Sequence, residues 1–215
     1  MKGQIELSKS IFIFFTIVIA IIVATAVLSK KAPEVNKAAG SGDDYQGSYG
    51  ESSGSVVFSA SYPKVTEKQI VDYLMQNGGP KLKYKGHNFY KYGVSYDIDP
   101  AFAVAVSQQE TSLGKATCEG ITEDCNNFFC IMAKEGQESC GKWAKYETPE
   151  EGIEAFYKLI RTSYVDQYGQ DTIAEIGCAP ETGRTTHCYC WEGGYCRPWV
   201  QNVPQYTMTI RRYSA

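Results

Sequence analysis

The chain has 215 residues, which allows one globular domain with appendages because domains average ~150 residues. Hydrophobic residues make up 43% of it and charged residues 21%, a balance typical of a folded rather than a disordered chain. The formal net charge of -3 lacks the basic excess of nucleic-acid-binding proteins, so we exclude nucleic acid as a partner.

An uncharged apolar run, SIFIFFTIVIAIIVATAVL, occupies residues 10–28. At a rise of ~1.5 Å per residue, a helix of this length spans the hydrocarbon core of a bilayer, which is ~30 Å thick. We predict one transmembrane helix, with residues 1–9 as a short N-terminus on the inner side. The alternative is a signal peptide cleaved after Ala26, but the apolar run is longer than the ~7–15 residues of a usual signal core.

A low-complexity segment, residues 29–61, follows the apolar run. It is rich in Gly, Ser, Asp and Glu, as in GSGDDYQGSYGESSGS, and such a composition cannot bury enough apolar area to order itself. We predict a flexible tether here and a single globular domain over residues 62–215.

Helix signals dominate this domain. Thr66 to Gln69 form a capping box that opens a helix ending before Gly78. Residues 81–96 are rich in Tyr, Lys and Gly, and we expect a loop there. Asp99, as N-cap before Pro100, opens a buried helix that contains AFAVAV and ends near Gly114.

Further helices are expected in the second half of the domain. Residues 148–151 read as another capping box with proline at the first helical position, followed by an apolar stripe over 153–164. We expect a short helix at 172–176 and a last helix from about Val203, with loops or short strands over 115–147. These patterns predict a mainly helical domain with one core.

All eight cysteines lie in one half of the chain and predict a disulfide framework in an oxidising compartment. The domain should therefore be extracytoplasmic. Eight cysteines allow 105 pairings, so the sequence leaves the pairing open. The candidates are Cys118, Cys125, Cys130, Cys140, Cys178, Cys188, Cys190 and Cys196.

A zinc site is the alternative for part of this cysteine set. His187, Cys188, Cys190 and Cys196 lie close together in the sequence. Their spacing is C-x-C rather than the C-x2-C that is usual for zinc, so we expect no metal and no other cofactor.

Glu110 is the residue whose position best suits a catalytic acid. It lies in the last turn of the buried helix, with Val106 and Ala103 on the same face. Partial desolvation there would raise the pKa of a carboxyl group, as is needed to protonate a leaving oxygen near neutral pH. The alternative is an exposed residue at a helix end without a catalytic role.

Four segments in order resemble one enzyme family. They are SQQETSLG (107–114), NNFFCI (126–131), AKYETPEEGIEAFYKLI (144–160) and WVQNVPQY (199–206). Together they are similar to glycoside hydrolase family 73, the endo-β-N-acetylglucosaminidases of bacterial cell walls, over residues 66–213. The resemblance implies a lysozyme-like α+β fold, peptidoglycan glycan strands as the substrate, and Glu110 as the catalytic acid.

The resemblance also implies further substrate-binding residues. Asn127 and Phe128 are expected to line the glycan groove, whereas Phe129 fits the core better. Tyr189 corresponds to a tyrosine of the family's active site. In this family a glycine stands where this chain has Cys130.

Aromatic and acidic residues elsewhere supply more candidates. Trp191 and Tyr195 lie near Trp199, and aromatic faces of this kind stack on sugar rings. Glu119, Glu123 and Asp124, in the loops after the helix, are candidates for a second carboxylate, which hydrolysis requires.

The expected function is therefore a membrane-anchored glycosidase that cuts the β-1,4 bond between GlcNAc and MurNAc. One alternative is a lytic transglycosylase, which needs no second carboxylate because the sugar's own 6-hydroxyl attacks. Another is a domain that binds peptidoglycan without cutting it, or a structural protein of a cell or virion membrane. The expected partners are glycan strands and the bilayer. If the protein is structural, it would also belong to a larger membrane or virion assembly.

Overall fold

The computed structural model describes residues 54–60, 64–121, 124–190 and 196–214. The predicted anchor, residues 10–28, lies outside them, as does most of the predicted tether. Within the described ranges, no helix combines the length and the apolar character needed to cross a membrane.

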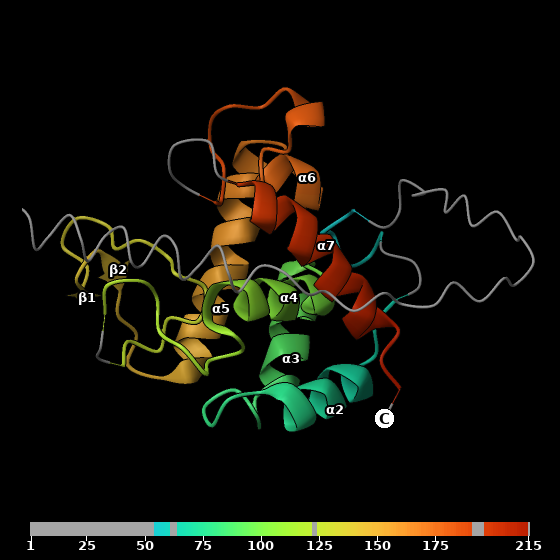
Figure 1. Ribbon diagram of the computed structural model, residues 1–215, viewed down its shortest axis with the longest axis vertical. Helices are drawn as coiled ribbons and strands as arrows, with labels where there is room; N and C mark the ends of the chain where they lie inside the picture. The colour runs from blue at the N-terminus through green and yellow to red at the C-terminus, as the bar shows by residue number, and fades with distance from the viewer. Residues whose placement is uncertain (1–53, 61–63, 122–123, 191–195, 215) are drawn as a thin grey trace, which may run out of the picture. The chain divides into compact units, whose positions relative to one another are not determined.

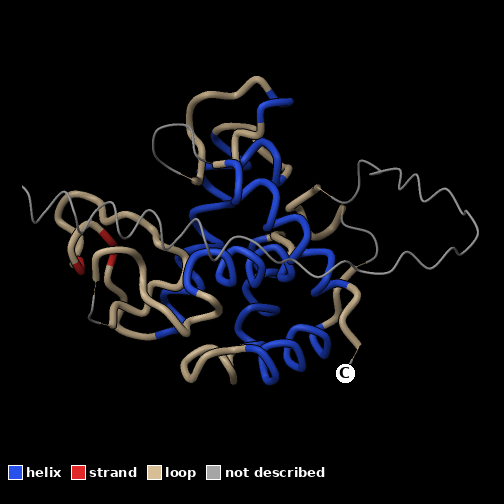
Figure 2. The backbone as a smooth tube through the Cα atoms, viewed as in Figure 1, coloured by secondary structure: helices blue, strands red, loops and turns tan. Residues whose placement is uncertain are grey.

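Helices make up most of the described domain (Figures 1 and 2). The α-helices are α2 (Glu67–Asn77), α3 (Gly86–Tyr96), α4 (Pro100–Thr111), α5 (Pro149–Leu159), α6 (Ile173–Ile176) and α7 (Arg197–Arg211). A π-helical segment (Ile160–Gln167) continues α5, and a 3-10 turn (Pro180–Thr182) follows α6. The capping box at Thr66 forms as predicted, and a further one forms at Thr172. At Thr148 only half of the predicted box forms, because the Glu151 side chain accepts from the backbone of Glu147 rather than from that of Thr148.

Helix α4 is the centre of the core (Figure 1). Asp99 accepts a hydrogen bond from the backbone of Ala101 and Pro100 occupies the first turn, so the helix begins where the sequence predicts. Every residue from Pro100 to Ser107 is buried, and the helix packs against α2, α3 and α7. An uncharged run fits a helix that is covered on all sides.

Helix α3 occupies a segment that we expected to be a loop. Its glycines are points of close helix packing rather than turn residues. A Cβ atom on Gly86 would lie 2.5 Å from Cα of Val71, and one on Gly93 would lie 2.5 Å from Cγ of Pro100. Glycine here lets the backbones approach, an effect that a single sequence does not distinguish from a loop signal.

The folded domain begins before residue 62. Val56 is fully buried, its amide donates to Asp171 O at 2.8 Å, and its carbonyl accepts from Asp99 N at 2.7 Å. Val56 and Phe58 therefore pack in or against the core rather than lying in a tether. The last helix also starts earlier than expected, at Arg197 rather than near Val203.

A loop lobe, residues 115–121 and 124–147, contains little regular structure (Figure 2). Its only named strands, among the described residues, are β1 (Ser139–Cys140) and β2 (Trp143–Ala144), which form an antiparallel pair. Disulfides Cys118–Cys130 and Cys125–Cys140 crosslink the lobe. The two bonds close overlapping loops of the chain, so together they constrain most of the lobe. They stabilise it in the absence of a large apolar core.

The other cysteines pair between α6 and α7, as Cys178–Cys188 and Cys190–Cys196. All eight cysteines are thus in disulfides, which confirms the predicted framework. A sulfur atom in a disulfide is not a thiolate ligand, so the alternative of zinc bound by the cysteines near His187 is not supported.

Asp99 and Arg211 form an ion pair inside the core. Nε of Arg211 donates to Oδ2 of Asp99 at 2.8 Å, and the exposed fractions of the two side chains are 1% for Arg211 and 0% for Asp99. The pair joins the start of α4 to the end of α7. A buried charge that loses its partner is strongly destabilising.

We expect Asp99→Asn to lower the free energy of unfolding by about 3–5 kcal/mol, because Arg211 would keep its charge without a counter-ion. Asparagine caps a helix as well as aspartate does, so the N-cap is retained. Urea unfolding of the purified domain measures the effect. The double variant Asp99→Asn/Arg211→Met should recover part of the loss, and simple additivity of the two changes would contradict the pairing argument.

Candidate active site

Glu110 lies where the buried helix α4 reaches the surface of the core. Its Oε1 accepts a hydrogen bond from Nε1 of Trp199, in the first turn of α7, at 3.1 Å. Directly after it the helix ends, because Ser112, Leu113 and Gly114 all adopt positive φ angles of 51°, 60° and 73°. This reversal carries the chain away and leaves the carboxyl group at the end of the helix.

The environment of Glu110 keeps its proton. Burial raises the pKa of Glu110 from 4.5 to about 7, and the hydrogen bond from Trp199 offsets part of that rise. Desolvation disfavours a charged carboxylate, whereas an N–H donor stabilises it. The side chain is therefore half protonated near neutral pH, as a general acid requires.

A cleft of about 570 Å³ lies beside Glu110. From α4 it is lined by Gln109 and Glu110. The loop lobe contributes Glu119, Phe129, Cys130, Ile131, Met132, Lys134, Lys142 and Trp143. The remaining lining residues, from α5 to α7, are Leu159, Tyr164, Cys188, Tyr189, Cys190, Pro198 and Trp199.

Aromatic rings pack together at the cleft. Phe129 stacks on Phe156 with ring centroids 4.1 Å apart, and the ring of Tyr189 lies 5.7 Å from that of Trp199. The hydroxyl of Tyr189 donates to Phe129 O at 2.6 Å. Burial raises the pKa of Tyr189 well above its ordinary value, so the phenol stays protonated and holds this hydrogen bond.

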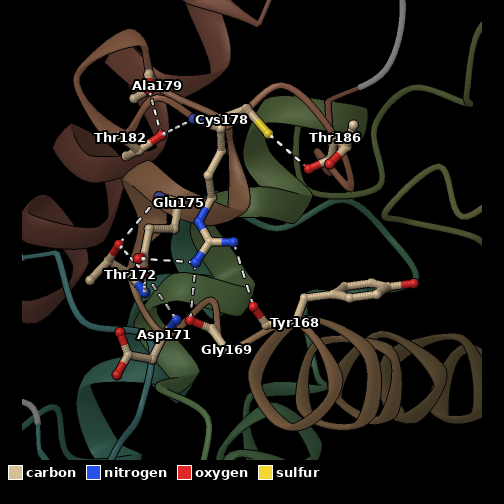
Figure 3. A network of polar contacts seen from close by, with 10 residues as sticks. Tyr168, Gly169, Asp171, Thr172, Glu175, Cys178, Ala179, Thr182 and Thr186 are labelled. Atoms are coloured by element: carbon tan, nitrogen blue, oxygen red, sulfur yellow. Dashed lines mark hydrogen bonds and ion pairs between the residues drawn. The ribbon is translucent and has the colours of Figure 1, made fainter.

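The segment that leads to Tyr189 is fixed by a polar network (Figure 3). Glu175 caps α6 by accepting from the backbone of Asp171 at 3.2 Å and of Thr172 at 3.3 Å, and these residues face one another in the figure. The guanidinium of Arg184 pairs with Glu175 at 3.5 Å and donates to the carbonyl of Gly169 at 3.4 Å. Together with the nearby disulfide Cys178–Cys188, these contacts hold Tyr189 at the cleft.

Asn127 and Phe128, expected in the groove, are instead parts of the supporting structure. The Asn127 side chain donates to the carbonyls of Ile131 and Ala144 at 2.8 and 2.9 Å and accepts from Ile131 N. Phe128 is 5% exposed and packs against Gly114. Phe129, which we expected in the core, is fully buried from solvent and also lines the cleft.

The candidates for a second carboxylate separate in space. Glu119 is exposed and lines the cleft, where Nε1 of Trp143 donates to its carbonyl at 2.8 Å. Asp124 is not among the lining residues and is ion-paired with Lys81. Although burial raises the pKa of Asp124, hydrogen bonds from Lys81 and from the Asn126 backbone hold it below its usual value.

Three predicted residues, Glu123, Trp191 and Tyr195, lie outside the described residues. The structure adds Trp143, Met132 and Tyr164, which line the cleft and were not expected there. The sequence held one signal for Trp143. A tryptophan next to the Gly141 turn of a short hairpin is expected at the surface, where it can contact a ligand, rather than in the core.

Comparisons with known proteins give no match to a family model and none among curated proteins. Three solved structures of S. aureus autolysin E are similar in fold. One, in complex with the muropeptide NAM-L-Ala-D-iGlu, has a TM-score of 0.55 and 20% identity over 74% of this chain and 71% of that chain. A catalytic Glu-to-Ala mutant with the disaccharide NAG-NAM has a TM-score of 0.52 and 21% identity, over 68% and 66%.

The third, autolysin E itself, also has a TM-score of 0.52, with 22% identity over 68% of this chain and 65% of that chain. At these identities the likeness shows the fold alone. It confirms the prediction of a mainly helical, lysozyme-like domain.

The raised pKa of Glu110 predicts a pH-dependent stability. Between pH 4.5 and about 7 the folded state holds the Glu110 proton more tightly than the unfolded state, so the free energy of unfolding falls as pH rises through this window. The loss above pH 7 is about 3 kcal/mol. Glu110→Gln should abolish it, being more stable than the parent at pH 8 and similar at pH 4.5.

Urea unfolding at the two pH values tests this prediction, with Glu181→Gln as a matched control because Glu181 is exposed and is not among the lining residues. The control should keep the pH dependence of the parent. Equal pH dependence in Glu110→Gln and the parent would contradict a desolvated carboxyl group.

Proposed function

We propose that this protein is a peptidoglycan glycosidase that cleaves the β-1,4 bond between NAG and NAM, with Glu110 as its general acid. The observation that carries the proposal is a carboxyl group with a pKa of about 7, held by burial at the edge of an aromatic-lined cleft. Glycosidic cleavage needs such a group to protonate the leaving oxygen.

The hydrogen bond from Trp199 orients the acid. Because Nε1 of Trp199 donates to Oε1 of Glu110, that oxygen is an acceptor, and Oε2 is left to carry the acidic proton. A neutral indole donor positions the carboxyl group without the full charge that would hold its pKa low. The contact thus sets the orientation of the acid, whereas burial raises its pKa.

The substrate class rests on the cleft and the fold. Tyr164, Trp143 and Trp199 line the cleft, and aromatic surfaces with polar edges suit sugar rings, which have apolar faces and hydroxyl rims. The solved relatives with this fold include autolysin E with NAG-NAM bound, which supports the same disaccharide here.

Two routes can complete the reaction after protonation. In hydrolysis, a second carboxylate activates water or attacks the sugar, and Glu119 is the described cleft residue that fits this role. In lytic transglycosylation the NAM 6-hydroxyl attacks instead. Transglycosylation is the second candidate because it needs only the acid. Among the described lining residues Glu110 is the buried carboxyl group, whereas Glu119 is exposed.

We expect Glu110→Gln to lower the rate of release of soluble fragments from purified sacculi by about 100-fold or more, since general acid catalysis contributes 10²–10⁴-fold. The rate of the parent should fall as pH rises above about 7, as Glu110 loses its proton. Glu181→Gln is the control and should match the parent. Unchanged activity in Glu110→Gln would favour a domain that binds glycan or supports a membrane assembly.

Mass spectrometry of the released fragments distinguishes the two routes. Hydrolysis leaves a new reducing sugar at the cut end of the strand. If the enzyme is a glucosaminidase, that sugar is NAG. Transglycosylation leaves 1,6-anhydro-NAM. Glu119→Gln should strongly reduce hydrolysis, whereas a transglycosylase would tolerate it.

The proposed location is the outer face of a membrane, anchored by residues 10–28. Their uncharged apolar sequence supports this, and the disulfides require an oxidising side. We expect the full chain to stay with membranes after an alkaline carbonate wash and to keep its N-terminus by intact mass. A product that begins at Val27 would show a cleaved signal peptide instead, and replacement of residues 1–28 by a cleavable signal should release the domain.

A further inference from the structure

Two lysines line the same cleft as Glu110. Lys134 and Lys142 lie on neighbouring backbone segments of the loop lobe, because Ala133 N donates to Lys142 O at 2.9 Å and Met132 forms an isolated bridge with Trp143. Both residues are exposed. Their ammonium groups are therefore available to a ligand that occupies the cleft.

These two lysines carry charges that no described carboxylate neutralises. The described ion pairs of the loop lobe involve other residues, such as Lys145, whose Nζ lies 2.6 Å from Glu138. Nζ of Lys142 lies 4.7 Å from the centroid of the Trp143 ring, a cation–π contact that keeps the ammonium group beside the cleft. The cationic side of the cleft is thus left unpaired.

The charge of the cleft differs from that of the chain. Its charged lining residues are Lys134, Lys142, Glu110 and Glu119, and the lining carries net positive charge whenever Glu110 is protonated. The whole chain has a formal charge of -3. A locally positive cleft in an acidic protein favours an anionic group on the ligand.

We propose that Lys134 and Lys142 bind the carboxylates of the peptide stems on peptidoglycan, so that the enzyme prefers strands whose stems are charged. This inference rests on the proposed function. Each NAM unit bears its stem on a lactyl ether, so stems project from every second sugar of a strand. A wall beside the strand therefore meets stem carboxylates, which lysine binds as a mobile point charge.

Synthetic NAG-NAM tetrasaccharides with dipeptide stems test the proposal, with the stem carboxylates either free or converted to carboxamides. The parent should show a lower KM for the free acids at low salt, and the preference should fade at high ionic strength. Lys134→Gln and Lys142→Gln should each raise that KM about three-fold, as expected for exposed ion pairs. The double variant should lose the preference.

Two further readouts separate charge recognition from catalysis. The pH profile should not change in the lysine variants, since burial and Trp199 set the pKa of Glu110. Lys158→Gln removes one exposed charge outside the cleft lining and is the matched control. Affinities for both oligosaccharides are also measured on the Glu110→Gln background, where cleavage does not interfere.

The outcomes distinguish this inference from the proposed function. If the parent binds the free acids better but cuts neither substrate, the glycosidase proposal fails and the stem site stands. If both substrates are cut and bound equally, or if the double variant keeps the preference, the stem site is overturned. A lysine effect that appears only on sacculi bearing phosphate polymers would also overturn it, because the anion would then be phosphate.

Discussion

The end of helix α4 is where packing and chemistry meet. The helix is buried from Pro100 to Ser107, so a carboxyl group one turn later is partly removed from water while a cleft still gives access to it. A position deeper in the helix would have no access, and one beyond Gly114 would be solvated. The proton affinity of Glu110 therefore follows from the helix that carries it.

Helices α4 and α7 are joined by a polar contact at each end, and so they run antiparallel. Arg211 at the end of α7 meets Asp99 at the start of α4, and Trp199 at the start of α7 meets Glu110 at the end of α4. The chemistry of the two contacts differs. Burial raises the pKa of both carboxyl groups. At Asp99 a cationic partner opposes that rise, whereas Glu110 has a neutral N–H donor and keeps an acidic proton near neutral pH.

The helical part and the loop lobe have separate roles around the cleft. The helices position the acid, and the lobe, crosslinked by Cys118–Cys130 and Cys125–Cys140, supplies the groups that face a ligand. Disulfides take the place of a large core in this lobe, which allows it to expose Lys134 and Lys142 without losing its shape.

Local signals in the sequence determined α4, the cap at Thr66, the disulfide framework and the placement of Glu110 at a helix end, because caps and apolar runs act within a few residues. They failed at α3, where Gly86 and Gly93 serve contacts with distant segments. Only the tertiary structure decided the disulfide pairing, the partner of Glu110, and the exchange of Phe128 for Phe129 at the cleft. Those features depend on which residues far apart in the chain come together, and neighbouring residues carry no record of that.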